Sequence, residues 1–110
     1  MINTIIKDIS PEDVKKMMDD KEDFVLIDVR NPDEYLEGHI PGAYNIPILF
    51  FVSTVQDVYP DKNKKYVLYC SIGKKAARAA MVMEKLGYTD ISNMGGINDW
   101  TYDISTDRTK

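Results

Sequence analysis

Apolar and polar residues follow two patterns along this chain: short apolar runs and stripes at helical spacing. Residues 24–29 and 66–70 are apolar almost throughout, which is typical of strands buried on both faces. Residues 74–86 form the clearest helical pattern, with alanine, methionine and leucine on one face and basic residues elsewhere. Strands that alternate with helices in this way predict an α/β fold with a mainly parallel sheet.

The remaining segments continue this alternation. Ser10 and Asn31 each precede a proline and two acidic residues, so each is expected to start a helix. Gly87 is expected to end the helix at 74–86. Further strands are expected at 4–6, 43–45 and 90–93, and further helices at 48–58 and 97–102. The tail from Ser105 is polar and is expected to be frayed.

Length and composition predict one ordinary globular domain. The chain has 110 residues, of which 44% are hydrophobic and 29% are charged. We expect a single domain over 1–110, with a core at about 4–102 and a polar tail at 103–110. The formal net charge of −4 argues against a general nucleic-acid binder.

The predicted compartment is the cytoplasm. No apolar stretch is long enough for a membrane span, so no membrane association is expected. The first eight residues are not typical of a signal peptide. Cys70 is the one cysteine, so an internal disulfide cannot form and an oxidising compartment is not required.

Metal and cofactor sites are not predicted. A structural zinc site needs four ligands, mainly cysteine and histidine, and the chain has one of each, Cys70 and His39. The single histidine also gives little support to a cysteine protease, because nothing in the sequence places His39 near Cys70.

Two apolar runs end in residues that can do chemistry. One ends in Asp28-Val29-Arg30, and the other ends at Cys70, followed by a short loop and a helix. Active sites of open parallel sheets lie at these carboxyl ends. In such a loop, backbone N–H groups and the helix N-terminus favour a thiolate and an anionic substrate. Equally, a lone cysteine at a strand end is commonly an inert core residue, and the residues alone leave both interpretations open.

Three motifs resemble those of a known family. Asp-Val-Arg at 28–30 is followed by Glu-Tyr at 34–35, Gly-His-Ile-Pro-Gly-Ala at 38–43 and Asn-Ile-Pro at 45–47. Cys-Ser-Ile-Gly-Lys-Lys at 70–75 is similar to an active-site loop of the form Cys-x-x-Gly-x-Arg, and Gly95-Gly96 with Trp100 forms the third motif. Together they resemble the rhodanese superfamily, specifically its single-domain sulfurtransferases.

The resemblance implies a rhodanese-like fold, with a five-stranded, mainly parallel sheet flanked by helices on both faces. It implies that Cys70 takes a sulfane sulfur as a persulfide from a small anionic donor such as thiosulfate. The acceptor would be cyanide or a thiol, on a small molecule or on a thioredoxin-like or sulfur-relay protein. Residues implied to bind substrate are the rest of the loop: Ser71, Ile72, Gly73, Lys74 and Lys75.

The sequence departs from the family pattern at the end of the loop. Lys75 stands where arginine is usual, and Ala76 stands where serine is common. Lysine keeps the charge but loses the bidentate grip of arginine on an oxyanion, so a changed preference for thiosulfate is expected. A non-catalytic rhodanese-like binding module is the main alternative. A phosphatase or arsenate reductase relative is less favoured, because related phosphatases carry a longer loop.

The other motif residues have structural interpretations. Arg30 is expected to form an ion pair, with Glu34 as the candidate partner. His39 is expected to be a hydrogen-bonded loop residue, Asp28 to bind loop backbone and Trp100 to lie in the core. Phe50 and Phe51 are either packed or exposed as an apolar lip for a protein partner.

Overall fold

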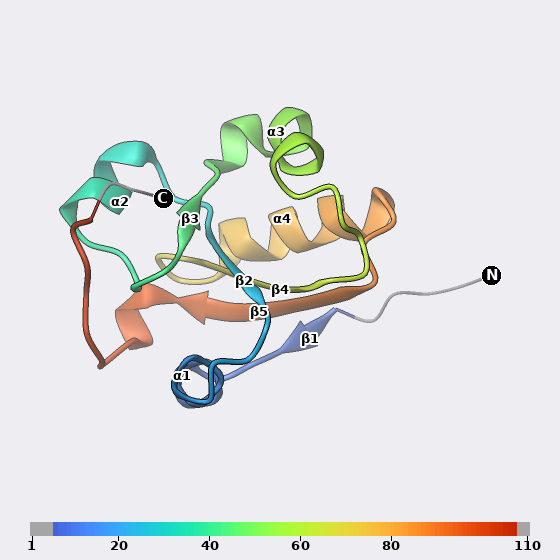
Figure 1. Cartoon of the computed structure of the whole chain (residues 1–110). Helices are drawn as coiled ribbons and strands as arrows, with labels where there is room; N and C mark the ends of the chain where they lie inside the picture. The colour runs from blue at the N-terminus through green and yellow to red at the C-terminus, as the bar shows by residue number, and fades with distance from the viewer. Residues whose placement is uncertain (1–5, 108–110) are drawn as a thin grey trace.

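A five-stranded sheet runs through the middle of the computed structural model, which describes residues 6–107 (Figure 1). The strand order is β1-β5-β4-β2-β3, and each neighbouring pair is parallel. The strands are β1 (Lys7–Asp8), β2 (Val25–Asp28), β3 (Tyr44–Asn45), β4 (Lys65–Cys70) and β5 (Asp90–Gly96). The α/β class is confirmed, and the sheet predicted to be mainly parallel is parallel at every pairing of these strands.

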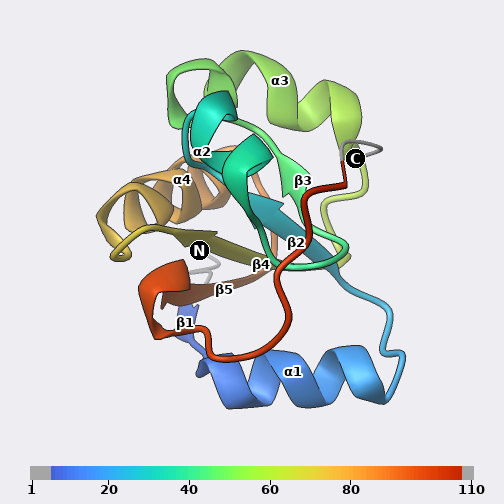
Figure 2. The ribbon, with the colours of Figure 1, turned by 90° about the vertical axis from the view of Figure 1, so that its left-hand side faces the viewer.

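Helices cover both faces of the sheet, as predicted. Figure 2 shows α1 below the sheet and α3 and α4 above it. The helices are α1 (Pro11–Asp19), α2 (Pro32–Glu37), α3 (Phe51–Val58) and α4 (Lys74–Lys85), with 3-10 turns η1 (Ile48–Phe50) and η2 (Ile97–Asp99). Two buried apolar clusters lie on opposite sides of β2 and β4, one against α3 and α4 and the other against α1.

Local sequence explains where the helices begin and how closely they pack. Ser10 Oγ accepts the Asp13 N–H at 3.0 Å, and Pro11 is the first residue of α1. On α4, three of the four buried side chains are alanines, at positions 76, 79 and 80. Such small side chains let α4 lie close to β4 and β5, which places its first turn beside the end of β4.

The first and last predicted elements are misplaced. The strand expected at 4–6 is wrong at Ile6, because β1 begins at Lys7 and pairs with Ser92 and Asn93; residues 4 and 5 lie outside the described residues. The helix expected at 97–102 is reduced to η2, because Trp100 adopts an extended backbone. The last strand continues three residues beyond the predicted 90–93, reaching Gly96.

Two further expectations differ in detail. The helix expected at 48–58 begins as the 3-10 turn η1 and becomes α-helical at Phe51. The expected frayed tail is wrong at Ser105, which exchanges two backbone hydrogen bonds with His39, at 2.8 and 2.9 Å. Residues 108–110 of the tail lie outside the described residues. Trp100 is buried in the α1-side cluster, as predicted.

Candidate active site

The carboxyl ends of β2 and β4 lie side by side. Asp28 is paired with Tyr69 in the sheet, so the residues that follow the two strands emerge at the same edge. Cys70 is the last residue of β4, and α4 begins four residues later at Lys74. Gly73 between them has a φ of +102°, in the left-handed region that favours glycine. The tight turn brings the start of α4 back over the sulfur.

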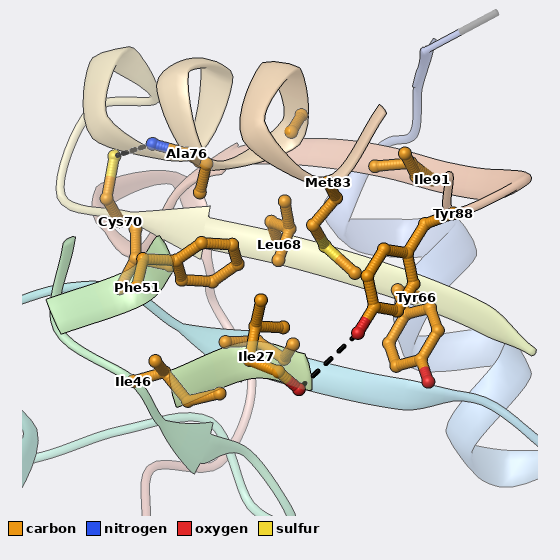
Figure 3. Close-up of a cluster of buried hydrophobic side chains, with 14 residues drawn as sticks. Ile27, Ile46, Phe51, Tyr66, Leu68, Cys70, Ala76, Met83, Tyr88 and Ile91 are labelled. Atoms are coloured by element: carbon orange, nitrogen blue, oxygen red, sulfur yellow. Dashed lines mark hydrogen bonds between the residues drawn. The ribbon is translucent and has the colours of Figure 1, made fainter. Parts of the chain in front are cut away.

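Two backbone amides point at the sulfur of Cys70. Its Sγ accepts the N–H of Gly73 at 2.9 Å and the N–H of Ala76 at 3.4 Å. Figure 3 shows the second contact, together with the packing of Phe51 beside Cys70. Both donors belong to the loop or to the first turn of α4, where the helix dipole is positive. This arrangement stabilises negative charge on the sulfur.

The sulfur lies at a small cavity that we call the Cys70 pocket. Its volume is about 240 Å³, and its lining consists of Cys70, Ser71, Ile72, Lys74 and Lys75. The structure therefore brings these sequence-predicted residues around one space, while Gly73 contributes its N–H to the sulfur. Cys70 is only 2% exposed, whereas Ile72 is 65% exposed at the rim. A reactant must enter the pocket to reach the sulfur.

Gly95 and Gly96 lie directly against the loop, a role that sequence reasoning missed. A Cβ added at Gly96 would lie 2.0 Å from the carbonyl oxygen of Ser71 and 2.7 Å from Cα of Ile72. A Cβ added at Gly73 would lie 3.2 Å from Cα of Gly95. The signal was present as two adjacent glycines at the end of a buried strand, where backbone segments approach closely.

Arg30 forms a buried ion pair, but with Asp28 rather than Glu34. Its Nη2 donates to Asp28 Oδ2 at 2.7 Å and to the carbonyl of Gly38 at 2.6 Å. Nε also donates to Asp28, whose Oδ1 accepts the Arg30 backbone N–H at 2.9 Å, as predicted for Asp28. Burial lowers the pKa of Arg30, but the bonds and charge of Asp28 outweigh it and leave that pKa raised.

Glu34 instead connects α2 to the loop. Its Oε1 accepts the N–H of Asn31 at 3.1 Å, and its Oε2 accepts from Ser71 Oγ at 3.3 Å. The first contact is the second half of a capping box, which the Asn-x-x-Glu spacing at 31–34 could have revealed. The second contact fixes the residue that follows Cys70.

His39 and Phe51 are buried outside the Cys70 pocket, whereas Phe50 is exposed. His39 is buried, its Nδ1 lies 2.8 Å from the carbonyl oxygen of Tyr35, and its ring stacks on the Tyr35 ring. The prediction of a hydrogen-bonded loop residue is confirmed, and His39 does not line the Cys70 pocket. Phe51 is 1% exposed and packed, whereas Phe50 is 55% exposed.

A second cavity lies on the other side of Ser71, and we call it the Arg30 pocket. Its volume is about 310 Å³, and Arg30, Glu34, Glu37, Gly38, Ser71, Ile97 and Asn98 line it. Ser71 is the residue common to both cavities. Within residues 6–107, no three His, Cys, Asp or Glu side chains are grouped as metal ligands, and no helix is long and apolar enough to cross a membrane.

Comparison with known proteins agrees with this geometry. The model of the rhodanese-like domain family matches residues 10–103. Thiosulfate sulfurtransferase PspE of Escherichia coli is 37% identical over 73 residues, which are 66% of this chain and 70% of that protein. The thiosulfate:glutathione sulfurtransferase of Saccharomyces cerevisiae is 33% identical over 108 residues, covering 86% of this chain and 78% of that protein.

The fold is shared with solved structures of the same family. The human single-domain sulfurtransferase TSTD1 superposes with a TM-score of 0.75 and 26% identity, covering 87% of this chain and 96% of that one. A rhodanese-related protein from Thermoplasma volcanium gives a TM-score of 0.78 at 26% identity, covering 92% and 99%. The chain belongs to the rhodanese-like domain family.

Proposed function

We propose that this rhodanese-type transferase moves a sulfane sulfur from a donor such as thiosulfate to cyanide or a thiol, through a persulfide on Cys70. One observation carries the proposal. The sulfur of the chain's single cysteine accepts two backbone N–H bonds and lies at a cavity lined by Lys74 and Lys75. Relatives named thiosulfate sulfurtransferases support the same reaction.

The reaction has two steps. In the first, the Cys70 thiolate attacks the outer sulfur of thiosulfate, the S–S bond of thiosulfate breaks, and sulfite leaves with the bonding electron pair. In the second, the acceptor attacks the outer sulfur of the Cys70 persulfide, and the S–S bond of the persulfide breaks. The acceptor then carries the sulfur, and Cys70 leaves as a thiolate that is ready for another donor.

The rest of the loop binds the donor in this proposal. The amides of Gly73 and Ala76 stabilise charge on the sulfur, and Lys74 and Lys75 attract the anionic end of the donor. Lys75 is half-buried in the wall of the cavity, and Lys74 is exposed. Ser71 and Ile72 complete the walls, so the whole segment 70–75 forms one substrate site.

The acceptor must come from outside the chain. The sequence contains one cysteine, so no internal thiol can resolve the persulfide. The acceptor of the persulfide sulfur is cyanide, a small thiol, or a thioredoxin-like or sulfur-relay protein. The proposal places this exchange in the cytoplasm, where thiols are kept reduced, and cell fractionation tests that location.

Intact-protein mass measurement tests the proposal directly. Incubation with thiosulfate should add the mass of one sulfur atom to the wild-type protein, and cyanide or a thiol should remove it. The variant Cys70→Ser should fold normally but gain no sulfur and show no turnover. A folded wild-type protein that gains no sulfur from thiosulfate, polysulfide or a persulfide donor would contradict the proposed function.

A further inference from the structure

An uncharged segment carries a group of exposed apolar side chains. Residues 38–56 contain no Asp, Glu, Lys or Arg, although 29% of the whole chain is charged. Within this segment Leu49, Phe50 and Val52 are each more than half exposed. We call these three residues the η1–α3 patch. Large apolar side chains that gather on a surface in this way are typical of an interaction site.

The η1–α3 patch lies next to the segment that forms the Cys70 pocket. η1 is in contact with α4, and Figure 2 shows α3 and α4 on the same side of the sheet. Phe51, which directly follows Phe50, packs beside Cys70 and belongs to the same buried cluster as Cys70 and Ala76 (Figure 3). The exposed patch and the buried sulfur therefore lie on either side of one layer of side chains.

The exposed side of α4 adds positive charge to this region. Lys74, Arg78 and Lys85 are exposed and Lys75 is half-buried, whereas Glu84 is the one acidic residue of the helix. None of the ion pairs among residues 6–107 includes any of these four cations. Since the whole chain carries a net charge of −4, positive charge is concentrated on this helix. Such a surface complements an acidic partner.

We propose that the η1–α3 patch and the basic side of α4 form one docking surface for an acidic protein that accepts the sulfur of Cys70, an assignment that rests on the proposed function. The partner presents its reacting thiol on a narrow protruding segment, because Cys70 is only 2% exposed. Apolar side chains behind that thiol cover the η1–α3 patch, and carboxylates around it face Lys74 and Arg78.

Other occupants fit this surface less well. A small thiol touches only the cavity, and Leu49, Phe50 and Val52 do not line it. In a symmetric dimer the basic side of α4 would face its own copy, which is repulsive. An anionic membrane would repel the net negative charge of the chain. The patch is also far smaller than a stable interface of about 20–30 residues a side, so the contact is transient, as transfer to a departing carrier requires.

The transfer step needs no further reactant. The partner's thiolate attacks the outer sulfur of the Cys70 persulfide, a new S–S bond forms on the partner, and the S–S bond to Cys70 breaks. The products are a persulfide on the partner and the Cys70 thiolate.

Acceptor peptides test the docking surface, with thiosulfate as donor. The acidic probe is acetyl-Cys-Gly-Gly-Leu-Phe-Asp-Glu-Asp-amide, and the basic probe has lysine at the three acidic positions. Arg78→Glu should reduce the acidic-to-basic ratio of kcat/KM about fivefold or more. Phe50→Ser should reduce kcat/KM about fivefold for both peptides. The matched control Lys16→Glu makes the same charge change on α1, at the opposite face of the sheet, and should leave the ratio unchanged.

Cyanide provides the internal control for these variants. It reaches the sulfur without docking, so its kcat/KM should be the same in Arg78→Glu, Phe50→Ser and the wild type. With cyanide turnover intact, an unchanged peptide ratio in Arg78→Glu or unchanged peptide kcat/KM values in Phe50→Ser would overturn the proposal.

A binding measurement separates this proposal from the proposed function. The acidic peptide with serine in place of its cysteine cannot accept sulfur, so its affinity, measured by fluorescence anisotropy of a labelled form, reports docking alone. It should bind the wild type and bind Arg78→Glu several-fold more weakly. Such binding without any sulfur gain on Cys70 would uphold the docking surface and refute sulfur transfer. Sulfur gain without such binding would refute the docking surface and leave sulfur transfer standing.

Two further measurements test the other occupants. Sedimentation velocity should show no self-association that depends on Phe50, and vesicles of phosphatidylserine and phosphatidylcholine should not co-sediment the protein. Self-association that Phe50→Ser abolishes would assign the surface to a second copy of the chain. Vesicle binding that Arg78→Glu abolishes would assign it to an anionic membrane, and either result would overturn the proposal.

Discussion

Gly96→Ala is expected to disable the active-site loop without replacing any residue of that loop. Gly96 has an ordinary extended backbone, with φ −122° and ψ 145°, so alanine fits its local conformation. The added Cβ would nevertheless lie 2.0 Å from the Ser71 carbonyl oxygen, and real Cβ contacts are essentially never under 3.0 Å. The obstacle is backbone, so the loop itself must move by about 1 Å or more.

The size of the effect follows from that displacement. Overpacking of this kind costs about 1–3 kcal/mol, and each kcal/mol lowers the Tm of a domain of this size by roughly 4–8 °C. The loop also carries the Gly73 N–H that bonds the Cys70 sulfur at 2.9 Å. A misplacement of about 1 Å at a catalytic geometry can reduce a rate by about 100-fold, so kcat/KM should fall by about that factor.

Thermal unfolding measures the loss of stability. Kinetics with thiosulfate and cyanide, measured well below the Tm, report the activity of the folded variant. Gly42→Ala is the matched control, because Gly42 has a φ of +86° and no atom within 4 Å of an added Cβ. Backbone strain should destabilise this control by about 1–2 kcal/mol while leaving kcat/KM unchanged. If folded Gly96→Ala keeps kcat/KM within about twofold of wild type, the close contact does not position the loop.

Three other changes probe the donor site and the stability of the fold. Lys75→Arg should lower KM for thiosulfate, and Lys75→Ala should reduce kcat/KM for thiosulfate by an amount equivalent to about 1–3 kcal/mol. If both variants have the same kcat/KM for thiosulfate as the wild type, Lys75 has no role in binding the donor. Asp28→Ala leaves the Arg30 charge buried and should cost about 3–5 kcal/mol in urea unfolding, whereas exposed Asp19→Ala should cost less than about 1 kcal/mol. Burial raises the pKa of Tyr66 from its ordinary value of 10.0 to about 12, so the folded state favours the neutral phenol, and stability should fall as pH rises from about 10 to 12. Tyr66→Phe should show a smaller fall over that range, and an identical fall would assign it to other groups.

Sequence patterns predicted the central elements of the fold well. The runs at 24–29 and 66–70 became β2 and β4, because strands buried on both faces need continuous apolar residues. The first strand was expected at 4–6 but β1 lies at Lys7–Asp8, whose two exposed residues have no apolar pattern. Its backbone pairing with β5 defines it, and long-range pairing leaves no local mark in the sequence.

The site was predicted to different degrees on its two sides. A strand end, a glycine and two lysines in six consecutive residues predicted the Cys70 pocket from local sequence. The Arg30 pocket joins α2, the Cys70 loop and η2, segments that are far apart in the chain. Only the fold brings these segments together, so no spacing rule could have revealed this cavity.

The burial of Cys70 limits what can receive its sulfur. The residue is 2% exposed at a cavity of about 240 Å³, so a flat protein surface cannot touch the sulfur. A small thiol can enter, whereas a protein acceptor must present its thiol on a protruding segment narrow enough for the cavity. Leu49, Phe50 and Val52, which are exposed on η1 and α3, do not line that cavity. Substitutions at these three residues should therefore leave transfer to small thiols unchanged, because selectivity among small thiols has to arise in the cavity itself.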